Sequence, residues 1–418
     1  MHGPIVANGP GHGECKRAGA CGGPGRVGDD PLVTSTRVQA RGADLRAWTT
    51  RLAPAAVYLA VRGVGLVVLA IMAAHDGTTL VERLTSWDGA WLLSIARHGY
   101  TDLPADHVDA FGNRTPVTPY GFFPGYPLLV SAVGSLTGGD LVAAGLVVSL
   151  VAGIGSAYGL TALAAAVPGG SRRAGLALVA LFAAMPMGVV LSMAYTEALF
   201  CALAVWALVG VLREDWLLAG VCAFGAGLVR PTGNAVAAAV VLAALAAVVA
   251  RRGGWRPWAG ALLAGAGILG YLAYVGVQAG SWDGWFRIQR EGWGWYFDGG
   301  RGTADFVAGV LGGGDRLFDV VVVAALIATI VLFVICAAMR LPWPLLVYAL
   351  VVLVTVWGTE GLMNAKLRLL VPAFVLLVPV AIGLARRRTS TVVAVLTGLA
   401  LASAWYGGYA LTIWPYAV

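Results

Sequence analysis

Long apolar runs alternate with short polar segments along almost the whole chain after residue 50. Eleven runs have about the length that crosses a bilayer, roughly 17–25 residues, although two of them are at the short limit. The runs fall at 54–74, 140–166, 172–192, 196–212, 215–230, 233–250, 257–278, 317–338, 343–358, 367–385 and 391–411. This pattern predicts an all-α, polytopic membrane protein with about 11 transmembrane helices.

The basic residues follow the alternation of these runs. Cytoplasmic loops of membrane proteins carry an excess of lysine and arginine. If the N-terminal flank is cytoplasmic, eleven spans place the arginines of five short loops on that same side: Arg172, Arg173, Arg213, Arg251, Arg252, Arg256, Arg340, Arg386, Arg387 and Arg388. The sequence therefore predicts a multi-pass protein of the cell membrane with a cytoplasmic N-terminus. Its two long loops, 75–139 and 279–316, are predicted to be extracytoplasmic.

This topology requires that one further apolar piece, residues 121–137, does not cross the membrane. Its sequence, GFFPGYPLLVSAVGSLT, contains two prolines and is followed by two glycines. Such a composition is typical of a juxtamembrane helix or a re-entrant segment.

Composition agrees with a chain that is mostly solvated by lipid. Hydrophobic residues make up 59% of it and charged residues 12%, against about 25% charged residues in a typical soluble protein. Residues 1–50 differ, because they are rich in Gly, Pro and Arg. We expect a disordered basic cytoplasmic tail there, followed by a membrane domain at 51–418. The net charge of +7 comes from arginines that map onto the loops, so we expect no nucleic-acid partner.

The first long loop contains a short amphipathic segment with an acid near its start. In SWDGAWLLSIARHGY, residues 86–100, Ser86 is suited to cap a helix and Asp88 falls in the first turn. Two interpretations of Asp88 stay open. An acid at this position stabilises a helix by about 0.3–1 kcal/mol through the helix dipole. A carboxylate kept ionised at a membrane surface can also act as a general base.

Several motifs resemble, in order, the PIG-V-type mannosyltransferases in their bacterial form. They are WDGAWLLSIARHGY, FFPGYPLLV, AYTEALF, LVRPTGN, FRIQREGWGW and AKLRLLVPAF, and the resemblance extends from about residue 55 to 385. The resemblance implies the C-type glycosyltransferase fold, an extracytoplasmic active site and a polyprenyl-phosphate sugar donor, typically of mannose. Trp91 and Leu92 stand where eukaryotic members have His-Phe, a departure that concerns the acceptor more than the sugar transfer.

The resemblance implies one displacement at the anomeric carbon, with inversion. Asp88 would accept the proton of the acceptor hydroxyl, and cations would bind the leaving lipid phosphate. Arg230, Arg368 and Lys366 are the candidates for phosphate binding, because the positive-inside bias disfavours basic residues on this face. The alternative for all three is that they extend toward the membrane interface from helix ends.

The same motifs supply candidate contacts to the sugar or the acceptor: Trp87, Trp91, Tyr195, Glu197, Arg287, Gln289 and Trp293. The tryptophans can equally form an interfacial aromatic belt. Glu197 can equally be an acid that complements a helix dipole. The expected acceptor is a glycolipid or a cell-envelope polymer.

No metal or other cofactor is expected, because Cys15, Cys21, His2 and His12 lack the usual zinc-ligand spacings. Arg62 lies inside the first apolar run, where a charge costs about 2.5–3.5 kcal/mol on insertion scales, so we expect it to face the bundle interior.

Two functions of other classes remain possible from the sequence. A lipid or solute transporter would more often carry mid-membrane charges in repeated halves, and we find no internal repeat. A non-catalytic subunit that presents a lipid to a partner would keep the aromatic loops without needing Asp88. An enzyme would need Asp88 in a cavity with Arg230 or Arg368 that opens toward lipid.

Overall fold

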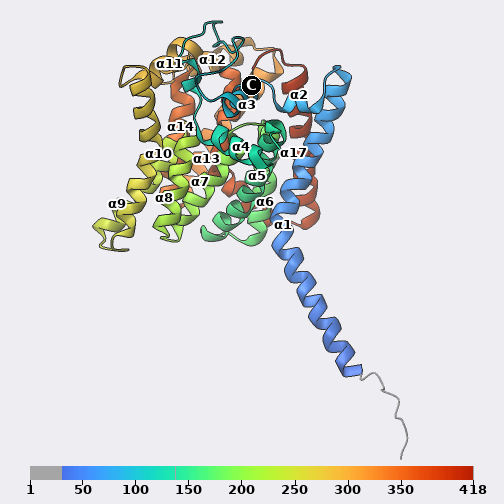
Figure 1. Ribbon diagram of the computed structural model, residues 1–418. Coiled ribbons are helices and arrows are strands. Elements are labelled where there is room, and N and C mark those ends of the chain that lie inside the picture. The colour runs from blue at the N-terminus through green and yellow to red at the C-terminus, as the bar shows by residue number, and fades with distance from the viewer. Residues whose placement is uncertain (1–30, 137, 418) are drawn as a thin grey trace, which may run out of the picture. The chain divides into compact units, whose positions relative to one another are not determined.

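The protein is built almost entirely from helices, as a computed structural model of residues 31–136 and 138–417 shows, with side chains described from residue 50 onward (Figure 1). The α-helices are α1 Pro31–His75, α2 Leu80–Leu84, α3 Asp88–His98, α4 Gly125–Leu136, α5 Leu141–Ala166, α6 Arg172–Ala183, α7 Glu197–Leu212, α8 Trp216–Val229, α9 Gly233–Val249, α10 Arg256–Gln278, α11 Gly284–Trp293, α12 Arg301–Gly313, α13 Leu317–Ala338, α14 Trp343–Gly358, α15 Lys366–Leu369, α16 Val378–Ala385 and α17 Thr389–Thr412. Short 3-10 helices lie between them: η1 Thr118–Gly121, η2 Gly188–Ser192, η3 Met363–Ala365 and η4 Val371–Leu377.

The apolar runs are helical but differ in length. Within the described residues, five helical stretches are long and apolar enough to cross a membrane: Thr50–His75 of α1, α5, α10, α13 and α17. A sixth candidate is the pair Met363–Leu369 and Val371–Ala385, which is bent by 58°. Shorter apolar helices form at other runs, among them α7, α8, α9 and α14. The predicted all-α membrane fold is confirmed, and the crossing of all eleven runs stays a prediction.

The run at 172–192 is not a single helix, contrary to the continuous span expected there. Helix α6 ends at Ala183, and η2 follows from Gly188 to Ser192. Pro186 lies between them. Proline removes a backbone donor and disfavours the helical conformation of the residue before it, so the helix stops at this point. The chain then reaches the start of α7 through a segment without regular α-helix, residues 184–196.

The beginning of the chain also differs from the sequence-based expectation. Helix α1 starts at Pro31, whereas we expected disorder over residues 1–50. The sequence from residue 31 to 50 contains only one glycine and one proline, and a proline is tolerated in the first turn of a helix. Residues 1–30 of the predicted tail lie outside the described part of the chain.

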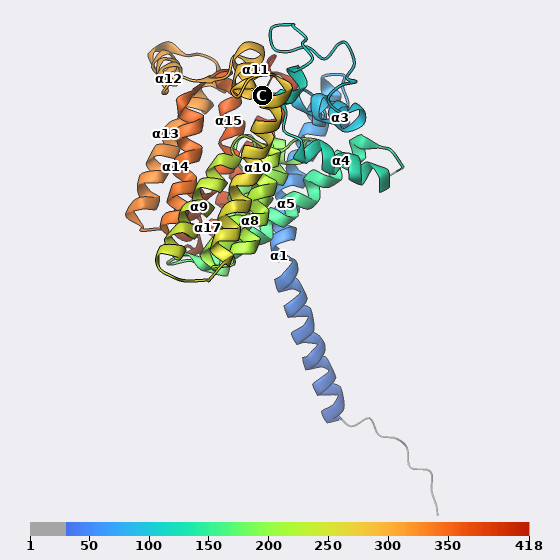
Figure 2. The same ribbon diagram turned by 60° about the vertical axis from the view of Figure 1, so that its left-hand side comes forward.

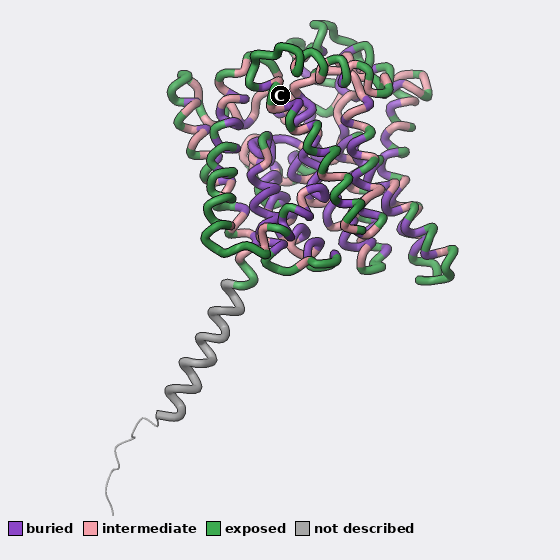
Figure 3. Tube along the Cα trace, turned by 180° about the vertical axis from the view of Figure 1, so that it is seen from behind, coloured by how far each residue is buried: buried purple, intermediate pink, exposed green. Residues whose placement is uncertain are grey.

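From Leu52 to Val418 the chain forms one compact unit. Buried residues fill the inside of the helix bundle, and exposed residues lie at its two ends and on its outer faces (Figure 3). Large apolar side chains remain exposed on the outer faces, for example Ile71 on α1, Leu262 on α10 and Val334 on α13. Such surfaces are suited to contact with lipid rather than with water.

Helices α8 and α10 pack closely through small residues. A Cβ added to Gly220 would come within 2.8 Å of the Cα of Gly260, and one added to Gly227 would come within 2.6 Å of the backbone nitrogen of Ile268. Helices in membranes associate through such close van der Waals packing. The start of α9 lies equally close to the end of α8, because a Cβ added to Gly233 would come within 2.6 Å of the Cα of Gly227.

The long loops and the arginine-rich turns lie at opposite ends of the bundle. Helices α2, α3, α11 and α12, all from the two long loops, lie at one end together with the C-terminus (Figures 1 and 2). At the other end, Arg173 donates to the carbonyl of Arg387, and Arg252 forms an ion pair with Glu214. This segregation agrees with the predicted alternation, and the side of the membrane that each end faces stays a prediction.

A small β-ladder joins the second long loop to the end of α14. Strand β1, Tyr296–Phe297, pairs antiparallel with strand β2, Thr359–Glu360. The side chain of Tyr296 also donates to Glu360 at 2.6 Å. The ladder therefore fixes the loop over 279–316 directly beside the bent segment that carries Arg368.

Candidate active site

Four charged side chains from distant parts of the sequence meet at the end of the bundle that carries the long loops. Arg368 Nη1 lies 2.6 Å from Asp88 Oδ2, and Arg368 Nε lies 3.4 Å from Glu197 Oε1. Glu197 also pairs with Arg230. Two acids and two arginines thus form a charge-balanced chain in the order Asp88, Arg368, Glu197, Arg230, which we call the charged cluster.

Exposure decreases from Asp88 through Arg368 to Glu197, and Arg230 is also nearly buried. The side chain of Asp88 is 35% exposed, those of Arg368 and Arg230 are 12% and 8% exposed, and that of Glu197 is 1% exposed. A buried charge is tolerated only when it is paired and hydrogen-bonded, and each inner member here has a partner of opposite sign. The cluster is therefore accessible at Asp88 and closed at Glu197.

Asp88 is placed by the start of α3. It is the first residue of that helix, in the first turn, so its carboxylate also complements the helix dipole. The expected cap at Ser86 is wrong, because Trp87 occupies the N-cap position and Ser86 Oγ donates to the carbonyl of Arg83. The preceding helix α2 ends at Leu84, so the Ser86 hydroxyl satisfies a carbonyl near its C-terminus instead.

The residue before Asp88 has a strained backbone. Trp87 has φ 56° and ψ −122°, a region that a bulky side chain rarely adopts and that costs about 1–3 kcal/mol. Gly89 follows and is buried against the ring of Tyr195 and the carbonyl of Ala194. The tight turn holds Asp88 close to the segment before α7, while the Trp87 side chain stays 42% exposed beside it.

Glu197 and Arg230 are fixed by the ends of two neighbouring helices. Glu197 is the first residue of α7, and Arg230 follows the last residue of α8 in an extended conformation, with φ −155° and ψ 155°. Pro231 comes next and disfavours a helical conformation at Arg230. Arg230 Nη1 donates to Thr196 Oγ1 at 3.2 Å, which orients its guanidinium toward Glu197.

Arg368 lies on the short helix α15 and is supported by an aromatic ring. Its guanidinium carbon is 5.3 Å from the ring centroid of Tyr195, a cation–π contact. The Tyr195 hydroxyl donates to the carbonyl of Ser86 at 3.2 Å, and the residue is 1% exposed. Tyr195 was expected to contact sugar or acceptor, and the structure places it behind Arg368 and under the turn that carries Asp88.

Lys366, only two residues from Arg368, points its amine elsewhere. Its Nζ donates to the carbonyls of Val356 and Thr359, at 2.7 and 2.6 Å, at the end of α14. The side chain is fully buried. Lys366 thus satisfies carbonyls at the end of α14, and the structure does not bring it together with the charged cluster as the phosphate prediction required.

An aromatic cluster lies close to Asp88 along α3. Trp91 stacks on Phe122 with ring centroids 5.1 Å apart, and Trp293 of α11 meets both rings edge-on at 5.7 and 5.4 Å. His107 packs against the other edge of Trp91 at 4.9 Å. The structure thus brings together two of the predicted sugar-contacting residues, Trp91 and Trp293, from the two long loops.

The other two candidates of the second loop hold that loop in place. Gln289 donates through Nε2 to the carbonyl of Gly121 at 3.0 Å, and Arg287 donates to the carbonyl of Ala279 at 3.2 Å. Gln289 therefore fixes α11 against η1 beneath the aromatic cluster. Arg287 is exposed near the end of α10, so the structure shows a contact within its own loop for this residue.

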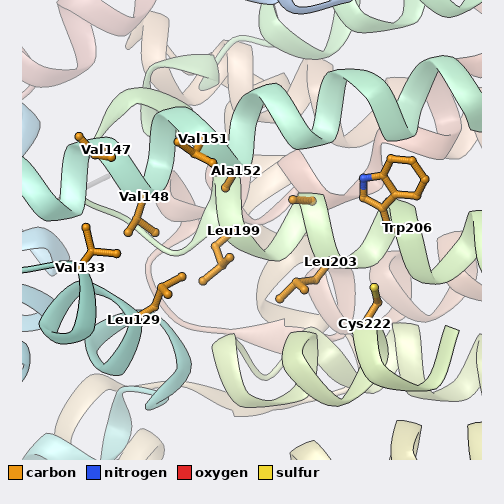
Figure 4. A pocket seen from close by; sticks show the side chains of 11 residues that line it. Leu129, Val133, Val147, Val148, Val151, Ala152, Leu199, Leu203, Trp206 and Cys222 are labelled. Carbon is orange, nitrogen blue, oxygen red and sulfur yellow. The ribbon is translucent and has the colours of Figure 1, made fainter. Parts of the chain in front are cut away.

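An apolar groove of about 290 Å³ lies between α4, α5, α7 and α8. Its lining includes Leu129 and Val133 of α4, Val148 and Val151 of α5, and Leu199 and Leu203 of α7 (Figure 4). Leu199 and Leu203 share one face of α7, whereas Glu197, the first residue of the same helix, lies about half a turn away from that face. The groove and the charged cluster therefore lie on opposite sides of α7.

Two residues that complete the site were not singled out from the sequence. Thr196 holds the guanidinium of Arg230, and Phe122 is the ring on which Trp91 stacks. Both lie inside quoted motifs, AYTEALF and FFPGYPLLV. A threonine beside an acid and a phenylalanine in an apolar run carry no local signal of a site, because their roles depend on partners far away in the sequence.

No protein-family model matches the sequence, and no curated protein matches it at the sequence level. Among solved structures, the chain is similar to ArnT from Cupriavidus metallidurans, which was crystallised bound to undecaprenyl phosphate. The two share 14% sequence identity and a TM-score of 0.50 over 85% of this chain and 75% of that one. The chain has the C-type glycosyltransferase fold. The predicted fold class is thereby confirmed, and the likeness concerns the fold alone.

Proposed function

We propose that the protein is a membrane glycosyltransferase that moves a hexose from a polyprenyl phosphate to a hydroxyl of a lipid- or polymer-linked acceptor. The observation that carries this proposal is the charged cluster, in which the partly exposed carboxylate of Asp88 lies next to Arg368. This pairing of a candidate base with a candidate phosphate ligand supports an enzyme rather than a transporter or a lipid-presenting subunit.

Arg368 and Arg230 bind the donor phosphate in this proposal. A guanidinium offers a planar fork of donors that matches a phosphate, and hydrogen bonds between charged groups are roughly twice as strong as neutral ones. Arg368 contacts two acids, Asp88 and Glu197. A phosphate can replace the outer one, Asp88, while the inner pair with Glu197 keeps the guanidinium in place.

This exchange frees the carboxylate of Asp88 to act as the general base. The acceptor oxygen attacks the anomeric carbon, the bond from that carbon to the phosphate oxygen breaks, and the phosphate keeps the electron pair. Asp88 takes the proton of the acceptor hydroxyl, for which it must come within about 2.6–3.2 Å of the hydroxyl oxygen. A single displacement inverts the configuration at the anomeric carbon, so a β-linked donor gives an α-linked product.

The apolar groove between α4, α5, α7 and α8 holds a distal part of the prenyl chain in this proposal. Its lining is almost entirely aliphatic, which suits a hydrocarbon chain. The likeness to ArnT, whose structure has undecaprenyl phosphate bound, supports a polyprenyl phosphate as the lipid.

The aromatic cluster formed by Trp91, Phe122 and Trp293 is the platform for the sugar or the acceptor in this proposal. It lies close to Asp88 on α3. Its rings have apolar faces, and the two tryptophans also carry a polar N–H at the ring edge. Mannose is the favoured sugar, because the sequence motifs resemble those of the PIG-V-type mannosyltransferases. The acceptor is a glycolipid or a cell-envelope polymer on the extracytoplasmic face.

The purified protein should transfer radiolabelled mannose from polyprenyl-phosphomannose to a component of a membrane lipid extract. Parallel reactions with polyprenyl-phosphate arabinose, glucose and galactose identify the sugar, and omission of the extract measures hydrolysis alone. Transfer from another of these donors would correct the sugar and keep the reaction class. Tight binding of polyprenyl phosphate without transfer from any donor would contradict the proposal and favour a lipid-presenting subunit.

A further inference from the structure

Arg62 is a buried arginine of the first membrane helix, and its side chain donates hydrogen bonds to both ends of one short segment of the chain. It lies on α1 and is 4% exposed. Its Nη1 donates to the carbonyl of Ala183 at 3.0 Å, and its Nε donates to Ser192 Oγ at 3.0 Å. Ala183 is the last residue of α6, and Ser192 is the last residue of η2. The guanidinium therefore connects both sides of the break that separates α6 from α7.

The position suits a positive charge. The C-terminal carbonyls of a helix carry a partial negative charge and lack partners within the helix. Backbone carbonyls within a membrane need an internal partner, and a broken helix is tolerated only when surrounding groups supply one. Arg62 supplies donors to the end of α6 and, through Ser192, to the end of η2. A charge in the middle of an apolar run thus has a local reason.

Two glycines make room for the guanidinium. A Cβ added to Gly188 would lie 3.1 Å from Arg62 Nη1 and 2.6 Å from the carbonyl oxygen of Ala183. A Cβ added to Gly65 would lie 3.1 Å from Arg62 Nη2. Glycine at these two positions therefore leaves the space that the guanidinium of Arg62 occupies.

Other side chains also donate hydrogen bonds to the backbone carbonyls of the break. Three further side chains donate to its carbonyls: Tyr58 of α1 to Leu191 at 3.4 Å, Ser403 of α17 to Met185 at 2.7 Å, and Ser149 of α5 to Met193 at 2.7 Å. The segment 184–196 is thus fixed by side chains from three helices. Of these side chains, Arg62 is the one that joins its beginning to its end.

The break leads directly into the charged cluster. Its last residues are Tyr195, whose ring supports Arg368, and Thr196, which holds Arg230. The backbone N–H of Ala194 also donates to the carbonyl of Leu84 at 2.9 Å, just before the turn that carries Asp88. A shift of this segment would move both arginines relative to Asp88.

We propose that Arg62 is a positioning residue: it fixes the break between α6 and α7 and thereby the geometry of Tyr195, Glu197 and Arg368. Its effect on turnover rests on the proposed glycosyl transfer, whereas its effect on geometry does not. Misplacement of reacting groups by about 1 Å can lower turnover about 100-fold. Arg62→Met, which keeps an unbranched side chain and removes the guanidinium donors, should therefore lower turnover about 10- to 100-fold.

The direct test is a fluorine label on the ring that Arg62 is proposed to position. With 3-fluorotyrosine at Tyr195, the ¹⁹F resonance of the purified protein in detergent reports the surroundings of Arg368 without any need for sugar transfer. Arg62→Met should shift or broaden this resonance. Arg62→Lys should give a smaller change than Arg62→Met, because a single ammonium group cannot replace the guanidinium, which donates to two acceptors at once. Leu69→Ala, a buried change on the same helix, is the control for general destabilisation.

An unchanged resonance in Arg62→Met, or an equal change in Leu69→Ala, would overturn the inference. If Arg62→Met does not fold, Ser192→Ala decides, because it removes one acceptor and keeps the charge. It should shift the resonance in the same direction by a smaller amount, and no shift would overturn the inference. A shifted resonance in a protein whose wild type transfers no sugar would retain the positioning role and reject the proposed function.

Discussion

At the scale of single residues, the site depends on how two arginines are shared between acids. Arg368 contacts Asp88 on its open side and Glu197 on its buried side. Glu197 is almost fully buried, so its negative charge has to stay paired. A ligand that displaces a partner of Arg368 will therefore displace Asp88. In the proposed function, this asymmetry gives the two acids different tasks: Glu197 holds the cations, and Asp88 is the base.

Arg368→Ala should weaken binding of a polyprenyl phosphate about 10- to 100-fold, because a hydrogen bond to a charged group contributes about 1.5–3 kcal/mol. Arg368→Lys should recover only part of the affinity, because a point charge does not reproduce the fork. Titration with a fluorescent prenyl phosphate measures both. Arg97→Ala removes an exposed arginine of α3 and is the matched control. Equal affinities of wild type, Arg368→Ala and Arg97→Ala would exclude Arg368 from the phosphate site.

Trp87 allows side-chain and backbone effects to be separated. Its positive φ is strained for any residue except glycine, so Trp87→Gly relieves strain that Trp87→Ala retains. We expect Trp87→Gly to be more stable than Trp87→Ala by about 1 kcal/mol, visible as a higher midpoint of thermal unfolding. If Trp87→Ala were the more stable variant, the turn before Asp88 would not be strained.

At the scale of elements, the functional residues lie where helices begin, end or break. Asp88 and Glu197 are the first residues of α3 and α7, Arg230 follows the end of α8, and Arg368 lies on a four-residue helix in a bent stretch. Such ends leave backbone groups without helical partners. Side chains from neighbouring helices therefore gather there, and the same places become polar sites within an apolar bundle.

Asp298 lies in the second long loop, 279–316, and its carboxylate holds the start of α12. Its carboxylate accepts from the backbone N–H of Gly300 at 2.7 Å and of Gly302 at 2.6 Å, at the start of α12. The hydrogen bond from Gly302, followed by that from Gly300, lowers the pKa of Asp298 below its usual value. The hydrogen bonds to the ionised Asp298 therefore stabilise the start of α12 fully at pH values above the usual carboxyl pKa. This stabilisation is lost as the pH falls through the lowered pKa of Asp298.

Asp298→Ala should therefore raise the hydrogen-exchange rates of the Gly300 and Gly302 amides at neutral pH and leave α5 and α7 unchanged. Wild type should approach the variant only in strongly acidic solution. Exchange measured by mass spectrometry on peptides from this loop provides the comparison. Equal exchange of the two proteins at neutral pH would show that Asp298 does not hold the start of α12.

At the scale of the whole molecule, the two long loops lie at the end opposite the arginine-rich turns. Helices α3 and α11, from the two loops, meet through Trp91 and Trp293. The charged cluster also lies at this end. In the proposed function, the lipid-linked donor reaches this end of the bundle laterally from the membrane, and the acceptor approaches from the extracytoplasmic side.

This topology can be tested by labelling in intact cells. A cysteine introduced at Thr101 or Gly300 should react with a membrane-impermeant maleimide from outside, and one at Gly170 or Gly253 should not. The two pairs lie at opposite ends of the bundle in the predicted topology. Reaction at Gly170 but not at Thr101 would contradict the predicted orientation.

The periodicity and the charge alternation were sufficient to predict an all-α membrane fold, because lipid exposure imposes long apolar helices whatever their partners. They did not reveal the break after Ala183, where one proline interrupts an otherwise apolar run. Nor did they separate Lys366 from Arg368, which are two residues apart in the sequence and point to different partners. Arg368 and Asp88 are 280 positions apart, and only the packed fold brings them together.

The most direct test of the account is the transfer rate of Asp88→Asn. The substitution keeps the size of the side chain, and loss of the dipole contribution costs the fold only about 0.3–1 kcal/mol. A general base predicts turnover lower by about 100- to 10,000-fold, with the donor bound at least as tightly, because Arg368 loses a competing carboxylate. Initial rates of detergent-solubilised wild type and variant, matched for monodispersity, measure this. A variant that keeps more than about a tenth of the wild-type rate would contradict the account and leave Asp88 as a helix-stabilising acid.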